Sequence, residues 1–356
     1  MKRRWVIAAG MVPLAVALGV AATRRRPRIA LSPDETGDSA LAARVKVHLA
    51  TSTDVRDRMS ISVIDGDDTR IASFGATADT EYEVGSVTKT MTASLLQEMI
   101  ERDEVSPDAR LGDFLDLGDS AAASVTLEDL ATHHSGLPRL PDTWRMYVDS
   151  LRFELLAKDP YRDTLERLVM DARATKLGPQ AFEYSNFGYA LLGQALAASK
   201  GSDYSALLQE RIFAPLGMSS SFAANRVSDL APGAPTGFTE SGRRSDPWVL
   251  GAYAPGGSVR STLTDLTAYV RAQLDGTAPG VSATEPRIDV DSDRIGYAWF
   301  TTPDGITWHN GTTGGFSSWI GFDRANGRGA VVLSNTASDV DGLGFALVRG
   351  DSTEHS

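Results

Sequence analysis

The sequence contains no cysteine and no concentration of positive charge, and each absence removes a class of function. Without cysteine there are no disulfides, no thiol nucleophile and no thiolate metal site. The net charge of −11, with no dense basic patch beyond the N-terminus, argues against a general nucleic-acid binder. His133 and His134 are adjacent, so they lack the spacing of a zinc pair and we expect them to satisfy a loop. We therefore expect no metal, no cofactor and no nucleic-acid partner.

Long apolar runs are also missing, with one exception at the N-terminus. Three basic residues at positions 2–4 precede an 18-residue apolar run at positions 5–22, and residues 20–22 are small enough for a cleavage site. Three arginines follow at positions 24–26. This order is typical of a signal peptide, but the run is also near the lower limit for a membrane span. We predict that residues 1–26 are a signal peptide or a membrane anchor, and that the chain is exported, either cleaved or anchored through residues 5–22.

The remaining chain has an ordinary globular composition, with 42% hydrophobic and 23% charged residues and no internal repeat. Residues 27–39 are polar and predict a linker, and residues 40–350 form one domain. Hydrophobic periodicity and turn signals predict helices at 41–50, 125–130, 163–175, 187–200, 204–213, 262–274 and 340–348, and strands at 59–65, 70–75, 295–300, 306–309, 317–322 and 329–335. The turn residues 65–68 predict that the first two strands form a hairpin. Thr126 is the expected N-cap of its helix, and Thr262 or Thr264 that of the helix at 262–274.

Strands near both chain ends surround a mainly helical block. This order implies an α/β (α+β) fold in which one antiparallel sheet is built from both ends of the chain, about residues 40–85 and 290–350. Residues 86–285 would then be a large helical insertion, and helices would flank the sheet.

The first candidate for chemistry is the stretch EVGSVTKT, residues 83–90. Ser86 opens a predicted helix, and Lys89 lies three positions on, which places both side chains on one face. A partly desolvated lysine can lose its charge and remove the proton of a serine hydroxyl. The unpaired N–H groups at the helix start suit a developing oxyanion.

Two further stretches accompany this motif in the chain: FEYSNFGY at residues 182–189 and WHNGTTGGFSS at residues 308–318. Together the three resemble the motifs of the serine β-lactamase and penicillin-binding-protein superfamily. The branch that they resemble contains class C β-lactamases, D-Ala-D-Ala carboxypeptidases and esterases. The stretches LATHHSGLP (130–138) and APGGSVRST (254–262) also fit. The resemblance covers residues 40–350 and implies a β-lactamase/DD-peptidase-like fold.

The resemblance implies three catalytic residues. Ser86 is the expected acyl-forming nucleophile, and Lys89 and Tyr184 are the candidate general bases. A phenol loses its proton near pH 10 in water, so Tyr184 would need cationic neighbours such as Lys89 to act near neutrality. The backbone N–H groups of Ser86 and Thr312 are the expected oxyanion donors.

Three residues are expected to bind substrate. Asn186 would orient Lys89 and bond an amide of the substrate. His309 would line the opposite wall of the cleft, and Gly311 would let its strand approach the ligand closely. His309 stands where related proteins carry a lysine that attracts a substrate carboxylate, and a mostly neutral histidine attracts it less.

These residues predict a serine hydrolase that acts through an acyl-Ser86 intermediate on a small-molecule or peptide substrate. The substrate would be a D-alanyl peptide, a β-lactam or a small ester. Because of His309, carboxypeptidase or esterase activity is favoured over efficient β-lactamase activity. The alternative is a catalytically weak penicillin-binding or sensor domain tethered at the membrane.

Overall fold

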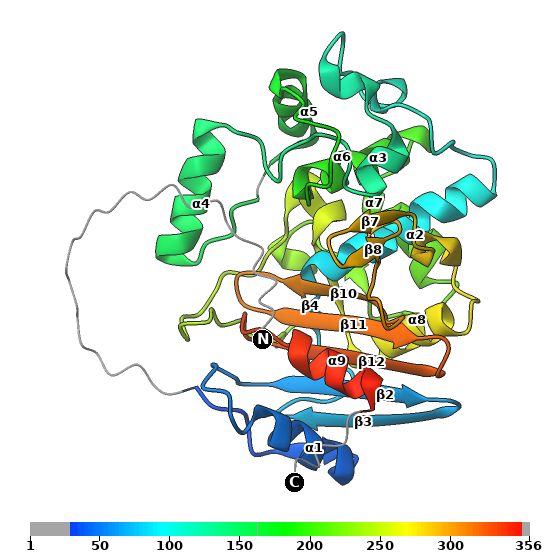
Figure 1. The fold of residues 1–356 in the computed structure, drawn as a ribbon. Helices are drawn as coiled ribbons and strands as arrows, with labels where there is room; N and C mark the ends of the chain where they lie inside the picture. Colours follow the sequence, from blue (N-terminus) through cyan, green and yellow to red (C-terminus); the bar gives the residue numbers. More distant parts are fainter. Residues whose placement is uncertain (1–28, 162, 351–356) are drawn as a thin grey trace.

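The computed structural model describes residues 29–161 and 163–350, and its centre is a large antiparallel sheet (Figure 1). In this part of the chain nine strands pair in the order β1-β3-β2-β12-β11-β10-β9-β8-β7. Their bounds are β1 Glu35–Gly37, β2 Met59–Asp65, β3 Asp68–Phe74, β7 Ile288–Val290, β8 Asp293–Ile295, β9 Phe300–Thr301, β10 Thr307–Thr312, β11 Ser317–Asp323 and β12 Arg328–Ser334. Strands from the N-terminal and C-terminal parts of the sheet meet where β2 pairs with β12, with Met59 opposite Ser334.

Helices cover both faces of the sheet. The helical bounds are α1 Ser39–Leu49, α2 Thr88–Glu101, α3 Leu127–Ala131, α4 Trp144–Leu156, α5 Leu165–Ala174, α6 Asn186–Ser199, α7 Tyr204–Leu208, α8 Leu263–Leu274 and α9 Asp341–Arg349. Helices α1 and α9 pack on one face, and α8 packs on the other (Figure 1). The remaining helices form a block beside the sheet, with α2 running from the sheet into it (Figure 1).

Alternating side chains on the central strands hold these layers together. On β12, Ala330 and Val332 belong to the core under α1 and α9, whereas Val331 and Leu333 belong to the larger core on the opposite face. Side chains of a strand point alternately to the two faces, so a strand buried on both sides must be apolar at successive positions. The sheet prediction, built from both chain ends with a helical insertion, is confirmed.

Several local predictions are also confirmed. The predicted hairpin at residues 59–75 is β2 and β3, and Thr126 and Thr262 cap α3 and α8 by accepting the amides of Asp129 and Asp265. The predicted linker, residues 27–39, contributes one element, because Glu35–Gly37 form the edge strand β1.

The single strand predicted at residues 295–300 is wrong. The structure has two short strands, β8 and β9, separated by a turn in which Ala298 has a φ of 63°. The amides of Tyr297 and Ala298 donate to the carbonyls of Ala283 and Ala131, so they cannot extend the strand. Tertiary hydrogen bonds thus interrupt a sequence with high strand propensity.

The helical region contains elements that the sequence pattern did not predict. A second sheet, in the order β4-β6-β5, joins Tyr82–Glu83, Val259–Ser261 and Phe222–Ala223. Strands of two or three residues are too short to show a period. Helix α4 was also not predicted. The predicted signal peptide or anchor at residues 1–26 lies outside the described residues. No helix among residues 29–161 and 163–350 has the length and apolarity to cross a membrane.

Candidate active site

Ser86 lies in η1 (Gly85–Val87), a single 3₁₀ turn between β4 and α2. The α-helix therefore begins at Thr88, two residues later than the sequence predicts. Gly85 has a φ of 51°, which reverses the chain after β4 and which L-residues with side chains rarely adopt. Between residues 81 and 99, Ser86 alone is not buried. The turn therefore presents the Ser86 hydroxyl at the surface of an otherwise closed core.

Lys89 is fully buried directly behind Ser86. Its Nζ donates hydrogen bonds to Ser86 Oγ at 2.9 Å and to the Gly256 carbonyl at 2.6 Å. No carboxylate in the described part of the chain pairs with it. Burial, and secondarily the positive charge of Arg139, holds the pKa of Lys89 well below its usual value. A neutral amine at hydrogen-bonding distance from a serine hydroxyl can accept its proton.

Tyr184 stands beside this pair, two residues before Asn186, the first residue of α6. The centroid of its ring lies 4.9 Å from Lys89 Nζ and 4.4 Å from that of the buried His133 ring. The Tyr184 hydroxyl is buried without a hydrogen bond of ordinary geometry. Burial raises the pKa of Tyr184 to about 12, although the nearby Ser86 hydroxyl and Arg139 lower it in part. Burial therefore shifts Lys89 toward its basic form and Tyr184 away from its basic form.

His133 explains how Tyr184 is held. Its Nδ1 accepts the backbone N–H of Ser185 at 3.0 Å, and the Ser185 hydroxyl in turn caps α6 by accepting the Gly188 amide at 2.8 Å. The prediction that the histidine pair satisfies a loop is confirmed for His133.

The end of β10 packs backbone against backbone on the Ser86 turn. A Cβ at Gly311 would lie 2.0 Å from the Val84 carbonyl oxygen and 2.9 Å from the Ser86 nitrogen, and one at Gly85 would lie 2.8 Å from the Thr312 nitrogen. Gly311 was expected to make room for a ligand, but the group that approaches it so closely is the turn itself. The contact brings the Ser86 and Thr312 amides to one place, which is the arrangement that an oxyanion hole requires.

His309 does not line the cleft as expected. The side chain is buried, with ring centroids 6.2 Å from Tyr184 and 5.9 Å from Phe300. Its Nδ1 lies 2.5 Å from the Asn310 carbonyl oxygen. Burial, and secondarily the charge of Lys89, lowers the pKa of His309 to about 3. A strand pattern shows which residues share a face, but it could not show that Tyr184, which precedes α6, and Phe300 in β9 would cover this one.

The low pKa of His309 predicts that acid destabilises the fold. The unfolded chain binds a proton on this ring near pH 6.5, whereas the folded chain does so only near pH 3. Stability is therefore complete above pH 6.5 and falls as the pH falls, by about 2 kcal/mol at pH 5. Urea unfolding at pH 7 and pH 5 should show a loss about 2 kcal/mol smaller in His309→Gln than in the wild type. An identical loss in both proteins would contradict this assignment.

The cleft in front of Ser86 contains residues that the sequence did not single out. Its lining consists of Gly85, Ser86, Arg139, Tyr161, Asn186, Trp248, Leu250, Tyr253, Gly256, Gly257 and Thr312. The ring of Tyr161 lies 5.3 Å, centroid to centroid, from both Trp248 and Tyr253, and these three form an aromatic wall. Arg139 lies over the Tyr184 ring at 5.3 Å. Arg139 directly follows residues 130–138, a stretch that fits the family resemblance, and this position was the only sequence signal that could have pointed to it.

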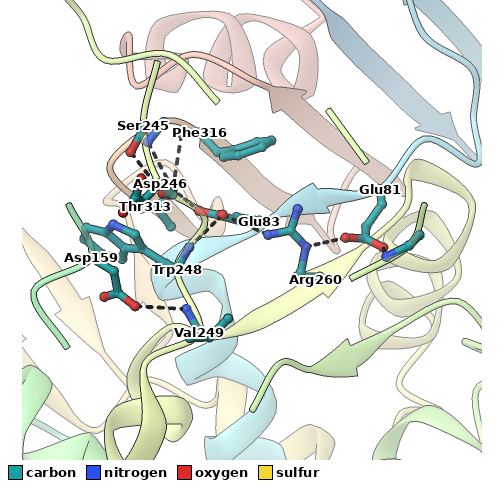
Figure 2. A network of polar contacts seen from close by, with 12 residues as sticks. Glu81, Glu83, Asp159, Ser245, Asp246, Trp248, Val249, Arg260, Thr313 and Phe316 are labelled. Carbon is teal, nitrogen blue, oxygen red and sulfur yellow. Dashed lines mark hydrogen bonds and ion pairs between the residues drawn. The ribbon is translucent and has the colours of Figure 1, made fainter. Parts of the chain in front are cut away.

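A buried carboxylate connects the parts of this site (Figure 2). Glu83, three residues before Ser86, accepts hydrogen bonds from Thr313 Oγ1 at 2.5 Å, Arg260 Nη1 at 2.8 Å and the Trp248 amide at 3.0 Å. Burial raises the pKa of Glu83, and Arg260 opposes this. Arg260 also binds Glu81 (Figure 2). Glu83 thus ties the nucleophile turn, the end of β10 and the aromatic wall to one another.

This arrangement can carry out acyl transfer. It offers a partly exposed hydroxyl, a buried amine within reach of it, a phenol beside both, and two amides that converge on the turn. Within residues 29–161 and 163–350 no three histidine, aspartate or glutamate side chains converge to hold a metal ion.

Comparisons with known proteins match most of the chain to one family. The family model described as Beta-lactamase matches residues 48–348. The chain is 25% identical over 340 residues to "Unguisins hydrolase ungD'" of Aspergillus campestris (strain IBT 28561), which covers 82% of this chain but only 60% of that protein. It is 26% identical over 311 residues to "Penicillin-binding protein 4" of Amycolatopsis lactamdurans, which covers 76% of this chain and 78% of that one.

Solved structures show the same fold. The class C β-lactamase of Rhodobacter sphaeroides superposes with a TM-score of 0.74 at 22% identity, over 88% of this chain and 99% of that one. At this identity the likeness speaks for the fold alone. The predicted fold class is confirmed.

Proposed function

The chain belongs to the β-lactamase family, and on this premise we propose that it is a serine hydrolase that cleaves esters or amides through an acyl-Ser86 intermediate. The resemblance to the serine β-lactamase and penicillin-binding-protein superfamily, predicted from three motifs, is confirmed by the family match and the relatives. Homologues in this family are serine hydrolases. The residue roles and the substrate preference below are our proposal.

One observation carries the proposal: the buried, carboxylate-free Lys89 amine at 2.9 Å from the half-exposed Ser86 hydroxyl. Desolvation shifts Lys89 toward its neutral form, and the neutral amine accepts the Ser86 proton as Oγ attacks the substrate carbonyl. The amides of Ser86 and Thr312 receive the negative charge that develops on the carbonyl oxygen. Proton return to the leaving group, directly from Lys89 or through the Tyr184 hydroxyl, releases it. Water then hydrolyses the acyl-Ser86 ester.

Tyr184 acts in this scheme as a neutral phenol. Its pKa of about 12 keeps the proton in place, so the hydroxyl relays a proton and does not act as a phenolate base. Asn186, at the first position of α6, has a side-chain oxygen without a hydrogen-bond partner in the described chain, and this oxygen suits a substrate N–H group.

The substrate class follows from the strand that faces Ser86. A neutral, buried His309 supplies no charge at the place where related proteins have a lysine. Residues 309–311 have the His-x-Gly form that carboxypeptidase-like and esterase-like relatives carry on this strand, so we propose that small esters or D-alanyl peptides are better substrates than β-lactams. Among the relatives, "D-alanyl-D-alanine-carboxypeptidase/endopeptidase AmpH" of Escherichia coli (strain K12), 28% identical over 173 residues, carries a name of this kind.

The test is to locate the acyl group. The purified protein is incubated with 4-nitrophenyl acetate, an N-acyl-D-alanyl-D-alanine peptide and nitrocefin, and product release and intact mass are followed. Trypsin cleaves after Arg70 and Lys89, so an acyl group on Ser86 adds its mass to the single peptide 71–89. Repeated product release together with this adduct supports the proposal. Product release with the mass on another peptide, or no adduct with any probe, overturns it.

The same experiment separates the alternative. A penicillin-binding or sensor domain forms the Ser86 adduct but releases product only once per molecule. A stable adduct without further turnover would overturn the hydrolase proposal in favour of that function.

A further inference from the structure

The lining of the cleft contains one cationic side chain and no carboxylate. Of the residues that line it, only Arg139 carries a permanent positive charge, and no aspartate or glutamate is among them. The protein as a whole has a net charge of −11. The sign of the charge in the cleft is therefore opposite to that of the molecule.

Arg139 is not committed to an internal ion pair. No carboxylate of the described chain binds its guanidinium, which lies over the Tyr184 ring. Other arginines nearby are occupied: Arg145 binds Asp163, and Arg260 binds Glu81 and Glu83. The backbone of Arg139 is fixed, because its carbonyl accepts the amide of Phe187 in α6 at 3.2 Å. The side chain is half-buried, which leaves part of the guanidinium accessible.

The other basic groups close to Ser86 cannot take this role. Lys89 is buried and its Nζ is used by Ser86 and Gly256. His309 is buried behind Tyr184. The positive charge of the site is thus that of Arg139, which lines the cleft together with Asn186 and Thr312.

We propose that Arg139 binds a carboxylate of the substrate, so that this enzyme selects anionic esters or amides. The planar guanidinium presents paired N–H donors that match the two oxygens of a carboxylate. The adjacent aromatic wall of Tyr161, Trp248 and Tyr253 packs against the apolar part of the same molecule. This inference rests on the proposed function and names the substrate class for it.

The test compares substrates that differ only in charge. One pair has the carboxylate on the acyl side, mono-4-nitrophenyl glutarate against its methyl ester. The other has it on the leaving group, 4-acetoxybenzoate against 4-acetoxybenzamide. The wild type should prefer the anion in at least one pair. Arg139→Gln should reduce that preference in kcat/KM by 10-fold to 100-fold, roughly the worth of a charged hydrogen bond. Arg139→Lys should retain part of it.

The ratio within a pair separates recognition from indirect effects. Arg139 also influences the pKa of Lys89, but a change in the base alters both members of a pair equally. Arg152→Gln is the matched control, since it removes the same charge from the exposed surface of α4 and should leave the ratio unchanged. Turnover of the neutral esters with a ratio that does not depend on Arg139 overturns this inference alone. Absence of any acylation of the wild type overturns the proposed function.

Discussion

Replacing Lys89 with methionine is expected to slow acylation of Ser86 by a factor on the order of 10⁴, without loss of stability. Methionine fills the same buried volume but cannot accept the Ser86 proton. The lysine amine is desolvated and has no carboxylate partner in the described chain, so its removal relieves a cost to the fold. Loss of the hydrogen bond to the Gly256 carbonyl lowers the free energy of unfolding by about 1 kcal/mol and so offsets part of that gain. Stopped-flow acylation and urea unfolding measure the two effects.

The stability difference between Lys89→Met and the wild type should depend on pH. Between its lowered folded pKa and the ordinary value of 10.5, Lys89 binds a proton in the unfolded chain but not in the folded one. Wild-type stability therefore rises with pH across that window, and the methionine variant lacks this rise. Its stability advantage should shrink as the pH approaches 10. Acylation by the wild type should fall as the pH drops below the folded pKa of Lys89.

Tyr184→Phe is the matched control for the choice of base. It keeps the ring that packs on His133 and removes only the hydroxyl. We expect a smaller loss, about 10²-fold, with the acid limb of the pH–rate profile unchanged. An acid limb that disappears in Tyr184→Phe, or acylation near the wild-type rate in Lys89→Met, would assign the base to Tyr184.

Gly311→Ala is expected to lower kcat by about 10²-fold and the free energy of unfolding by about 2 kcal/mol. The new Cβ would lie 2.0 Å from the Val84 carbonyl oxygen, and both atoms at this contact are held by backbone, so β10 must move away from η1. That movement separates the Thr312 and Ser86 amides. A displacement near 1 Å at such a site costs about two orders of magnitude in rate. The loss should appear in kcat and leave the mass of the Ser86 adduct unchanged.

Gly342→Ala provides the control for the same change in a place with room. Its Cβ would lie 3.7 Å from His48 Nε2, in the first turn of α9. Alanine is the better helix former, so stability should stay equal or rise by up to about 1 kcal/mol. Equal effects of the two substitutions on kcat would show that the contact between β10 and η1 is not what sets the rate.

Features that depend on neighbouring residues were predictable from the sequence. The Thr126 and Thr262 caps and the β2–β3 hairpin depend on a few adjacent side chains and backbone groups, and they formed as predicted. Ser86 and Lys89 belong to the same class, because one helical turn sets their separation.

Features that depend on distant contacts were not predictable. The single strand predicted at residues 295–300 is interrupted because amides within it donate hydrogen bonds to the carbonyls of Ala131 and Ala283. His309 became buried because Tyr184 and Phe300 arrive from other elements. Arg139 and Glu83 could not be assigned to the site from the sequence, because only the fold brings Arg139 to the lining of the cleft and Glu83 into contact with Trp248.

The pairing of β2 with β12 fixes when the nucleophile can become active during synthesis. The Ser86 turn leaves the ribosome before the strands that complete its surroundings, because β10 to β12 lie much later in the chain. Such long-range pairing is slow to form, because the loop between the strands must close first. The nascent chain therefore carries Ser86 without the Thr312 amide beside it, and we expect the site to be assembled only after β10 has joined the sheet.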